Sequence, residues 1–98
     1  MWSDKLLAYD FGPRHPMAPT RLDLTMRLLA ELGLLGHFDV ITPRLATAAE
    51  LELAHDPAFL AALRQASATG IAPPGYGLGD SDTPIFPGMY EAAARIAG

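Results

Sequence analysis

The chain has 98 residues, a formal net charge of −4 and no cysteine, and half of its residues are hydrophobic. A chain of this size and apolar content supports one modest core, which excludes a disordered or fibrous protein, and its acidic balance argues against nucleic-acid binding. The chain has no cysteine, its start does not resemble a signal peptide, and it has no apolar run of about 18 residues. We therefore expect a cytoplasmic protein with no membrane or nucleic-acid partner.

The first predicted element is a short strand over residues 6–11, a run of apolar and aromatic side chains that stops at the following glycine. A loop with three prolines then occupies residues 12–21. Because proline fixes φ and removes a backbone donor, this loop can be neither a helix interior nor a central strand. It is predicted to be stiff and to deliver His15, Met17 and Arg21 to defined positions.

Residues 20–32 predict an amphipathic helix, because leucine and methionine recur there at helical spacing. Thr20 is the expected N-cap, and Gly33 is the expected left-handed residue beyond the end of the helix. Met26 and the leucines are predicted to form a buried face and not a ligand-binding stripe.

The middle of the chain predicts a second strand and two helices. Residues 39–42 carry two β-branched side chains before a proline, which favours a brief strand. The capping-box sequence Thr47-Ala-Ala-Glu50 predicts a helix that ends near Ala54. Asp56-Pro57 is typical of the start of another helix, which is expected to fade near Ala68.

That helix is predicted to bury Phe59, Leu60 and Leu63. Residues 70–87 are rich in glycine and proline and show no periodicity, so they predict a long structured loop. A last helix is expected over residues 89–97. Strands that alternate with helices predict an α/β architecture, in which helices cover a sheet. Since two short strands cannot form a stable sheet alone, the chain is expected to be a fragment of a single domain, without a second domain.

Few side chains suggest a chemistry from the sequence alone. His15, His37 and His55 show no metal-ligand spacing and are expected to be structural or surface residues, and a cysteine-based zinc site is impossible. No serine has the surroundings of a catalytic nucleophile. The sequence therefore predicts no catalytic residue and no metal ligand.

Three charged residues leave alternatives open. An exposed carboxylate at Asp80 or Asp82 could accept hydrogen bonds from the backbone of a ligand, or could simply bond its own downstream backbone in a turn. Arg21 could be a solvated group at the start of a helix, or could be directed inward toward an anion by the prolines before it. Composition does not decide between these alternatives.

Three segments in order carry a resemblance to a known family. Residues 11–21 contain His-Pro-Met-x-Pro-x-Arg before a leucine-rich helix, residues 43–60 include a histidine ahead of a Phe-Leu pair, and residues 77–90 contain Asp-Thr-Pro. From about residue 8 to the last residue, the chain resembles the histone deacetylase superfamily, particularly its bacterial acetoin-utilisation and acetylpolyamine amidohydrolase-like branch. The resemblance implies an open, mostly parallel sheet with covering helices, related to arginase, that carries a zinc-dependent amidohydrolase.

The resemblance also implies substrates and substrate-binding residues. Members of the family remove acetyl groups from lysine side chains or from small acetylated amines. Asp82 matches a rim aspartate that binds backbone amides of a peptide substrate, and Arg21 matches an arginine beside an internal cavity below the active site. Met17 and Phe11 match positions that line this cavity.

The family's zinc ligands, paired histidines and catalytic tyrosine have no counterpart in these 98 residues. The chain by itself is therefore expected to bind no zinc and to be inactive, as the N-terminal part of a zinc-dependent deacetylase-like enzyme. The alternative is a free-standing, non-catalytic regulatory or partner-binding remnant of the same fold. In either case, apolar helix faces without a covering sheet would favour association.

Overall fold

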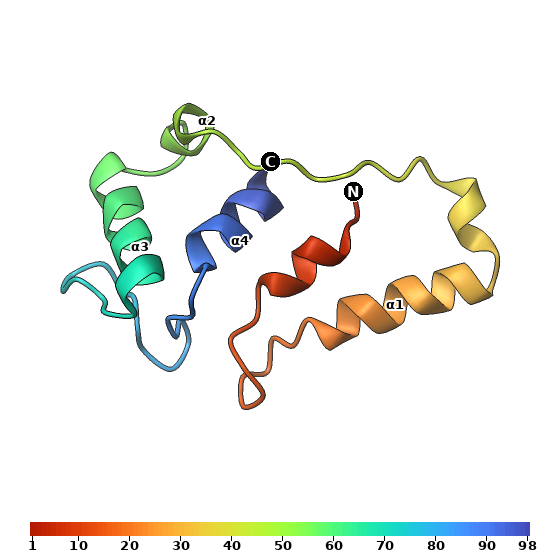
Figure 1. The fold of residues 1–98 in the computed structure, drawn as a ribbon, viewed down its shortest axis with the longest axis horizontal. Helices are drawn as coiled ribbons and strands as arrows, with labels where there is room; N and C mark the ends of the chain where they lie inside the picture. Colours follow the sequence, from red (N-terminus) through yellow and green to blue (C-terminus); the bar gives the residue numbers. More distant parts are fainter.

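The computed structural model describes residues 1–98 as an open arrangement of helices and loops, with extents of 47 × 33 × 18 Å (Figure 1). The elements in chain order are two 3-10 helices and four α-helices: η1 (Asp4–Ala8), α1 (Thr20–Glu31), η2 (Leu34–His37), α2 (Ala48–Glu52), α3 (Pro57–Thr69) and α4 (Met89–Ala97). The element η1 lies against both α1 and α4, and α3 packs on α4. None of these helices combines the length and the apolarity needed to cross a bilayer.

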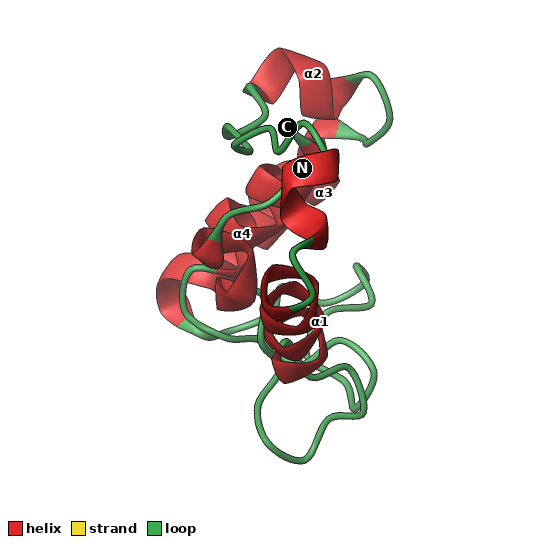
Figure 2. Cartoon of the chain, turned by 90° about the vertical axis from the view of Figure 1, so that its right-hand side faces the viewer, coloured by secondary structure: helices red, strands yellow, loops and turns green.

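The two predicted strands do not form, so the sheet expected within these residues is absent (Figure 2). Where a strand over residues 6–11 was expected, η1 begins at Asp4 and is capped by the Ser3 side chain. Residues 39–42 belong to no helix or strand, and one backbone hydrogen bond, from Trp2 N to Ile41 O at 2.9 Å, ties them to the N-terminal segment. A strand is stabilised by a ladder of such bonds to a neighbour, and these segments have no such ladder.

The helix predicted over residues 20–32 is confirmed as α1, with Gly33 in the left-handed conformation at φ 68°. Two details of the prediction are wrong. Thr20 is not the N-cap, because Pro19 already has helical dihedral angles and no side chain caps the helix. The predicted buried face is also wrong, since no residue of α1 is buried.

Three exposed leucines, two in α1 and one at its C-cap, form a stripe. Leu24, Leu28 and Leu32 are spaced four residues apart and are 60%, 59% and 61% exposed. This spacing places them on one side of the helix. We refer to these three residues as the α1 stripe.

The core lies between α3 and α4. Its buried apolar side chains come from these two helices alone: Leu60, Ala62, Ala66, Met89, Ala92 and Ala94. The predicted burial of Leu60 is therefore confirmed, whereas Phe59 and Leu63 are only half-buried. Polar contacts add to this packing, because the Tyr90 backbone N–H donates to Ser67 Oγ at 3.2 Å.

The predicted helix boundaries of the second half are confirmed. Thr47 and Glu50 form the capping box of α2, and the Asp56 side chain caps α3, which ends at Gly70 in the left-handed conformation. The predicted loop over residues 70–87 contains no helix or strand, and α4 follows it as expected.

Candidate functional site

The proline-containing loop, residues 12–21, bends back beneath η1, and its last two residues form the start of α1 (Figure 1). Gly12 begins it at φ 93°, a conformation that L side chains rarely adopt, and its N–H donates to Asp10 Oδ1 at 2.8 Å. The His15 N–H donates to the Gly12 carbonyl at 3.1 Å and closes a turn. Local hydrogen bonds and prolines therefore fix the loop that carries two of the predicted site residues, Met17 and Arg21.

A pocket of about 470 Å³ opens beside this loop. It is bounded by η1, the proline-containing loop, the first turn of α1 and one face of α4, and ten residues line it: Met1, Leu6, Tyr9, Met17, Ala18, Pro19, Arg21, Leu22, Ala93 and Ile96. Eight of the ten are hydrophobic. We refer to it as the Arg21 pocket.

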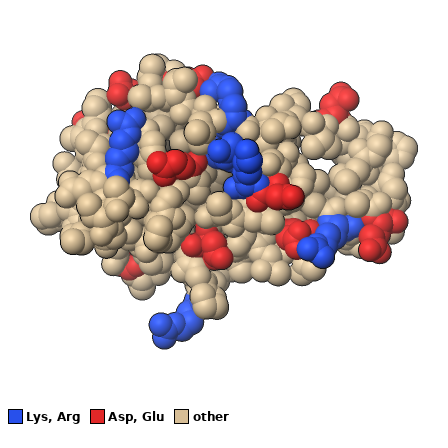
Figure 3. All heavy atoms as spheres, viewed as in Figure 1, with Lys and Arg blue, Asp and Glu red and all other residues tan.

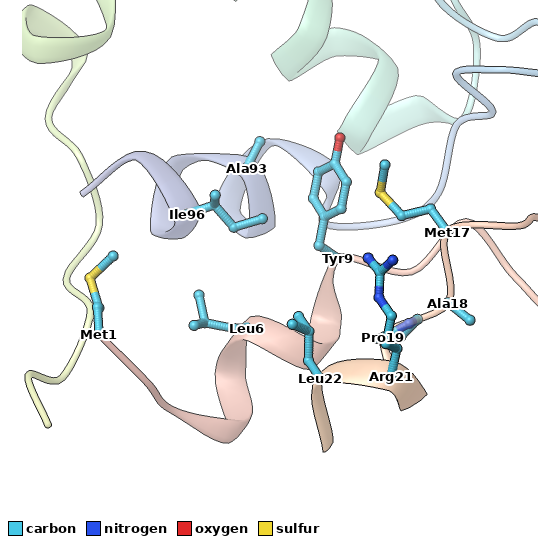
Figure 4. Close-up of a pocket in the computed structure, with 10 residues that line it drawn as sticks. All are labelled: Met1, Leu6, Tyr9, Met17, Ala18, Pro19, Arg21, Leu22, Ala93 and Ile96. Atoms are coloured by element: carbon cyan, nitrogen blue, oxygen red, sulfur yellow. The ribbon is translucent and has the colours of Figure 1, made fainter. Parts of the chain in front are cut away.

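Two of the predicted site residues meet at this pocket. Figure 4 shows the Arg21 side chain extending from the start of α1 toward the pocket, on the side where Tyr9 and Met17 also lie. The Arg21 guanidinium makes no ion pair, since the ion pairs of the chain join other residues. A cation in a largely apolar pocket suits a small anion such as a carboxylate, which a guanidinium binds through two parallel hydrogen bonds.

Phe11 lies outside the Arg21 pocket, in an aromatic cluster with Tyr9, His15 and Phe86. The Phe11 ring lies 5.1 Å from that of Tyr9 and 5.6 Å from that of Phe86, both edge-on, and 4.5 Å from the His15 imidazole. Edge-on aromatic pairs at these separations are favourable. The cluster joins the start of the chain to the segment just after Asp82.

The loop around Asp82 distinguishes the two candidate aspartates. Asp80 Oδ1 accepts hydrogen bonds from the Thr83 N–H at 2.7 Å and from the Asp82 N–H at 2.9 Å. These contacts, first of all that with the Thr83 backbone, lower the pKa of the Asp80 carboxyl below its usual value. Asp82 is exposed and its carboxylate accepts no hydrogen bond from the chain. Asp80 therefore builds the turn, and Asp82 presents a carboxylate to solvent.

One contact joins the Asp82 loop to the proline-containing loop. His15 Nε2 lies 3.3 Å from the Asp82 carbonyl oxygen, and His15 Nδ1 lies 3.1 Å from the Met17 backbone nitrogen. The structure thus brings Met17 and Arg21 together at the pocket. Asp82 is linked to the same loop through His15, whereas Phe11 belongs to the aromatic cluster.

The remaining histidines do not contribute to a metal site. His55 lies beside Phe59, with 5.7 Å between ring centroids, and His37 is exposed at the end of η2. No group of three or more histidine, aspartate or glutamate side chains is close enough together to hold a metal ion. The residues present therefore do not fit a catalytic zinc site.

Acidic and basic side chains are intermixed on the face shown in Figure 3, without a large patch of one sign.

Sequence reasoning missed part of the pocket lining. Tyr9, Ala93 and Ile96 line the Arg21 pocket, although no motif marks them. The spacing of Ala93 and Ile96, three residues apart on α4, indicates a shared face. The spacing gives no indication that this face of α4 lies opposite the proline-containing loop. The two elements are about 75 positions apart in the sequence, and helical periodicity reports only on near neighbours.

Comparisons with known proteins give one consistent result. The sequence profile of the histone deacetylase domain matches residues 15–98. The chain is 39% identical over 101 residues to the acetoin utilization protein AcuC of Bacillus subtilis, and 41% identical over 102 residues to that of Staphylococcus xylosus. In each case the alignment covers 100% of this chain and 26% of the relative, so the chain spans about a quarter of their length. No solved structure gave a significant match.

Proposed function

This chain belongs to the histone deacetylase family, and we propose that it forms the N-terminal part of a zinc-dependent deacetylase-like amidohydrolase of the acetoin-utilisation type. The substrate is an acetylated lysine peptide or a small acetylated amine. In this proposal the chain supplies the wall of a product cavity and a carboxylate at the substrate rim. The arginase/deacetylase-like sheet, the metal ligands and the general base come from the rest of the enzyme.

The Arg21 pocket is the observation that carries the proposal. A single guanidinium without an ionic partner stands in a pocket whose lining is otherwise mostly hydrophobic. Acetate, the product of deacetylation, has one carboxylate and one methyl group. The carboxylate suits Arg21, and the methyl group suits apolar neighbours such as Met17.

The Asp82 carboxylate supports the second role. It is exposed and has no hydrogen-bond donor within the chain, while Asp80 already uses its Oδ1 to hold the turn. An ionised carboxylate accepts hydrogen bonds at both oxygens, so Asp82 can bind two backbone N–H groups of an extended peptide. A small acetylated amine has no such backbone, and its binding should depend less on Asp82.

The bond-breaking chemistry belongs, in this proposal, to the rest of the enzyme. Zinc, when bound in the intact family enzyme, polarises the acetyl carbonyl and activates water. No side-chain group of this chain fits that ion. Residues 1–98 act by binding and orienting the substrate and its product.

A chimaeric enzyme tests the proposed function. In it, this chain replaces the matching segment of the Bacillus subtilis relative, and acetate release is measured from an acetyl-lysine peptide and from an acetylated diamine. We expect activity comparable to that of the unaltered relative, which is the positive control, and its loss after zinc is removed by a chelator. A well-folded chimaera that releases no acetate while the unaltered relative does would contradict the proposal.

Asp82→Asn tests the rim role within the same chimaera. Loss of a charged acceptor that bonds two N–H groups should raise KM for the peptide roughly tenfold, with little change for the acetylated diamine. Asp39→Asn is the matched control, because Asp39 is exposed and lies in the extended segment away from both loops. Equal peptide KM values for all three proteins would reject the rim role alone.

A further inference from the structure

The His15 imidazole makes two hydrogen bonds that define its tautomer. The Met17 backbone N–H can only donate, so Nδ1, at 3.1 Å, must be the acceptor and carries no proton. A neutral imidazole of this form carries its proton on Nε2. Nε2 therefore donates to the Asp82 carbonyl oxygen at 3.3 Å, which can only accept.

These two bonds connect segments that are far apart in the sequence. One bond holds the ring within its own loop, two residues from its backbone, and the other spans 67 residues to the loop that carries Asp82. The ring is half-buried, and its centroid lies 4.5 Å from that of the Phe11 ring, with the two planes tilted by 51°. Packing and hydrogen bonding thus restrict the ring to one orientation.

From this arrangement we infer that His15 is a positioning residue for substrate binding. It holds the backbone of Asp82 against the proline-containing loop and thereby fixes where the Asp82 carboxylate stands relative to the Arg21 pocket. The inference rests on the proposed function, because it concerns the rim that would bind a peptide. It assigns to His15 no contact with substrate and no part in proton transfer.

A histidine that merely filled space would not need two directed bonds. The loop has further support, since the Asp82 N–H donates to Asp80 Oδ1 at 2.9 Å, and Phe86, four residues later, packs edge-on against Phe11 with 5.6 Å between ring centroids. That contact fixes the end of the loop, and the His15 bond fixes the residue that carries the carboxylate. Loss of the bond should therefore loosen Asp82 without unfolding the segment.

Two substitutions of His15 distinguish its hydrogen bond with the Met17 N–H from its hydrogen bond with the Asp82 carbonyl. In His15→Asn the side-chain oxygen can replace Nδ1 as acceptor for the Met17 N–H, as in an Asx turn, but the side chain is too short to reach Asp82. In His15→Gln the longer amide can replace Nε2 as donor to the Asp82 carbonyl. His37→Asn is the matched control, because His37 is exposed and makes no hydrogen bond through its ring.

The experiment measures KM and kcat in the chimaeric enzyme for the acetyl-lysine peptide and the acetylated diamine. We expect His15→Asn to raise KM for the peptide about fivefold, the size typical of one lost hydrogen bond, with kcat and both diamine parameters unchanged. His15→Gln should raise the peptide KM less than His15→Asn does, and His37→Asn should leave the peptide KM unchanged. In the Asp82→Asn variant, adding His15→Asn should raise the peptide KM little further, because His15 acts through the Asp82 carboxylate and that carboxylate is already absent.

The outcomes separate the inference from the proposed function. An unchanged peptide KM in His15→Asn, beside a raised one in Asp82→Asn, would overturn the positioning role and leave the proposed function standing. If His15→Asn changed KM equally for the peptide and the diamine, His15 would have a general structural role and the positioning role would be overturned. The same would follow if the effects of His15→Asn and Asp82→Asn on the peptide KM were additive. A chimaera without activity would overturn both. Nitrogen-15 NMR of the imidazole adds a check without activity: a neutral ring with its proton on Nδ1 would contradict the inference.

Discussion

Helices α1 and α3 have similar lengths and are both amphipathic, yet only one of them contributes to a core. The 13 residues of α3 bury Leu60, Ala62 and Ala66 against α4, whereas the 12 residues of α1 bury none. Most helical stability in proteins comes from packing of the apolar face and little comes from helix propensity. The comparison teaches that an apolar stripe predicts a helix, but its burial depends on what the rest of the fold places opposite.

Small residues explain why α3 and α4 fit together. Ala66 is fully buried, and Ala92 and Ala94 are nearly so, which allows the two helix backbones to approach closely. Polar contacts then fix the register, since Arg64 Nη2 donates to the Tyr90 hydroxyl at 2.6 Å. The α1 stripe, with three large leucines, has no such neighbour. We expect the rest of the enzyme to cover it.

The largest expected effect comes from truncating one leucine in each helix. Leu60→Ala leaves a cavity between α3 and α4 and should lower the free energy of unfolding by about 2–4 kcal/mol. Leu24→Ala removes an exposed side chain and should change it by less than about 0.5 kcal/mol in this chain. Urea unfolding followed by circular dichroism measures both.

Similar losses for the two variants would contradict the comparison, because they would mean that α1 is also packed. The same pair in the chimaeric enzyme sharpens it further. If the rest of the enzyme covers the α1 stripe, Leu24→Ala should there become destabilising by about 2 kcal/mol or more.

A smaller effect is expected at the ends of the two helices. Gly70 and Gly33 both adopt the left-handed conformation, at φ 72° and φ 68°, and an added Cβ would meet nothing within 4 Å at either position. Alanine should therefore cost about 1 kcal/mol of conformational energy alone. In Gly70→Ala this cost should appear in global unfolding, because α3 belongs to the core.

In Gly33→Ala the cost should appear locally, as faster amide hydrogen exchange at the end of α1, with less change in global stability. Gly36→Ala is the control, since Gly36 has no positive φ and equally open surroundings. Equal global losses for Gly33→Ala and Gly70→Ala would show that α1 and α3 unfold as one unit.

The α1 stripe should also govern association. Exposed leucines in a row favour contact between copies of the chain at high concentration. Leu28→Glu should reduce the concentration dependence of the mass measured by light scattering, while changing stability by less than about 0.5 kcal/mol. A concentration dependence equal to that of the unaltered chain would place the associating surface elsewhere.

The sequence was informative where local rules decide the structure. The caps of α2 and α3 at Thr47 and Asp56, and the end of α1 at Gly33, follow from side-chain and backbone chemistry within a few residues. It misled where the outcome depends on distant partners. The strand pattern of residues 39–42 needs a neighbouring strand to supply hydrogen bonds, and the leucines of α1 need an opposing surface.

The same distinction applies to the candidate site. The motif around Met17 and Arg21 could be located in the sequence, and a resemblance to the family assigned it a role. The contact of His15 with Asp82 could not be predicted, because it spans 67 residues and is a single bond to a backbone carbonyl, which no side-chain pattern encodes.

The smallest expected effect concerns an exposed ion pair that joins Arg44, in the segment before α2, to Glu50 of α2. Arg44 donates to both oxygens of Glu50, at 2.8 and 2.6 Å, and the Thr47 N–H donates to Oε2 at 2.8 Å. Two residues beyond Arg44, the Ala46 N–H bonds the Ala94 carbonyl of α4 at 2.9 Å. The Arg44 hydrogen bonds, followed by those of Thr47, lower the pKa of Glu50 from 4.5 to about 2.

Because the folded-state pKa of Glu50 is lowered, its stabilisation of α2 is fully present above pH 4.5 and is lost as the pH falls toward about 2. Carboxyl carbon-13 NMR should therefore give a Glu50 titration midpoint near 2. Glu50→Gln should abolish the loss of amide protection at the start of α2 in this pH range, whereas Glu52→Gln, at an exposed position on the same helix, should leave it in place. A Glu50 midpoint at its ordinary value of 4.5 would show that the pair does not persist in solution.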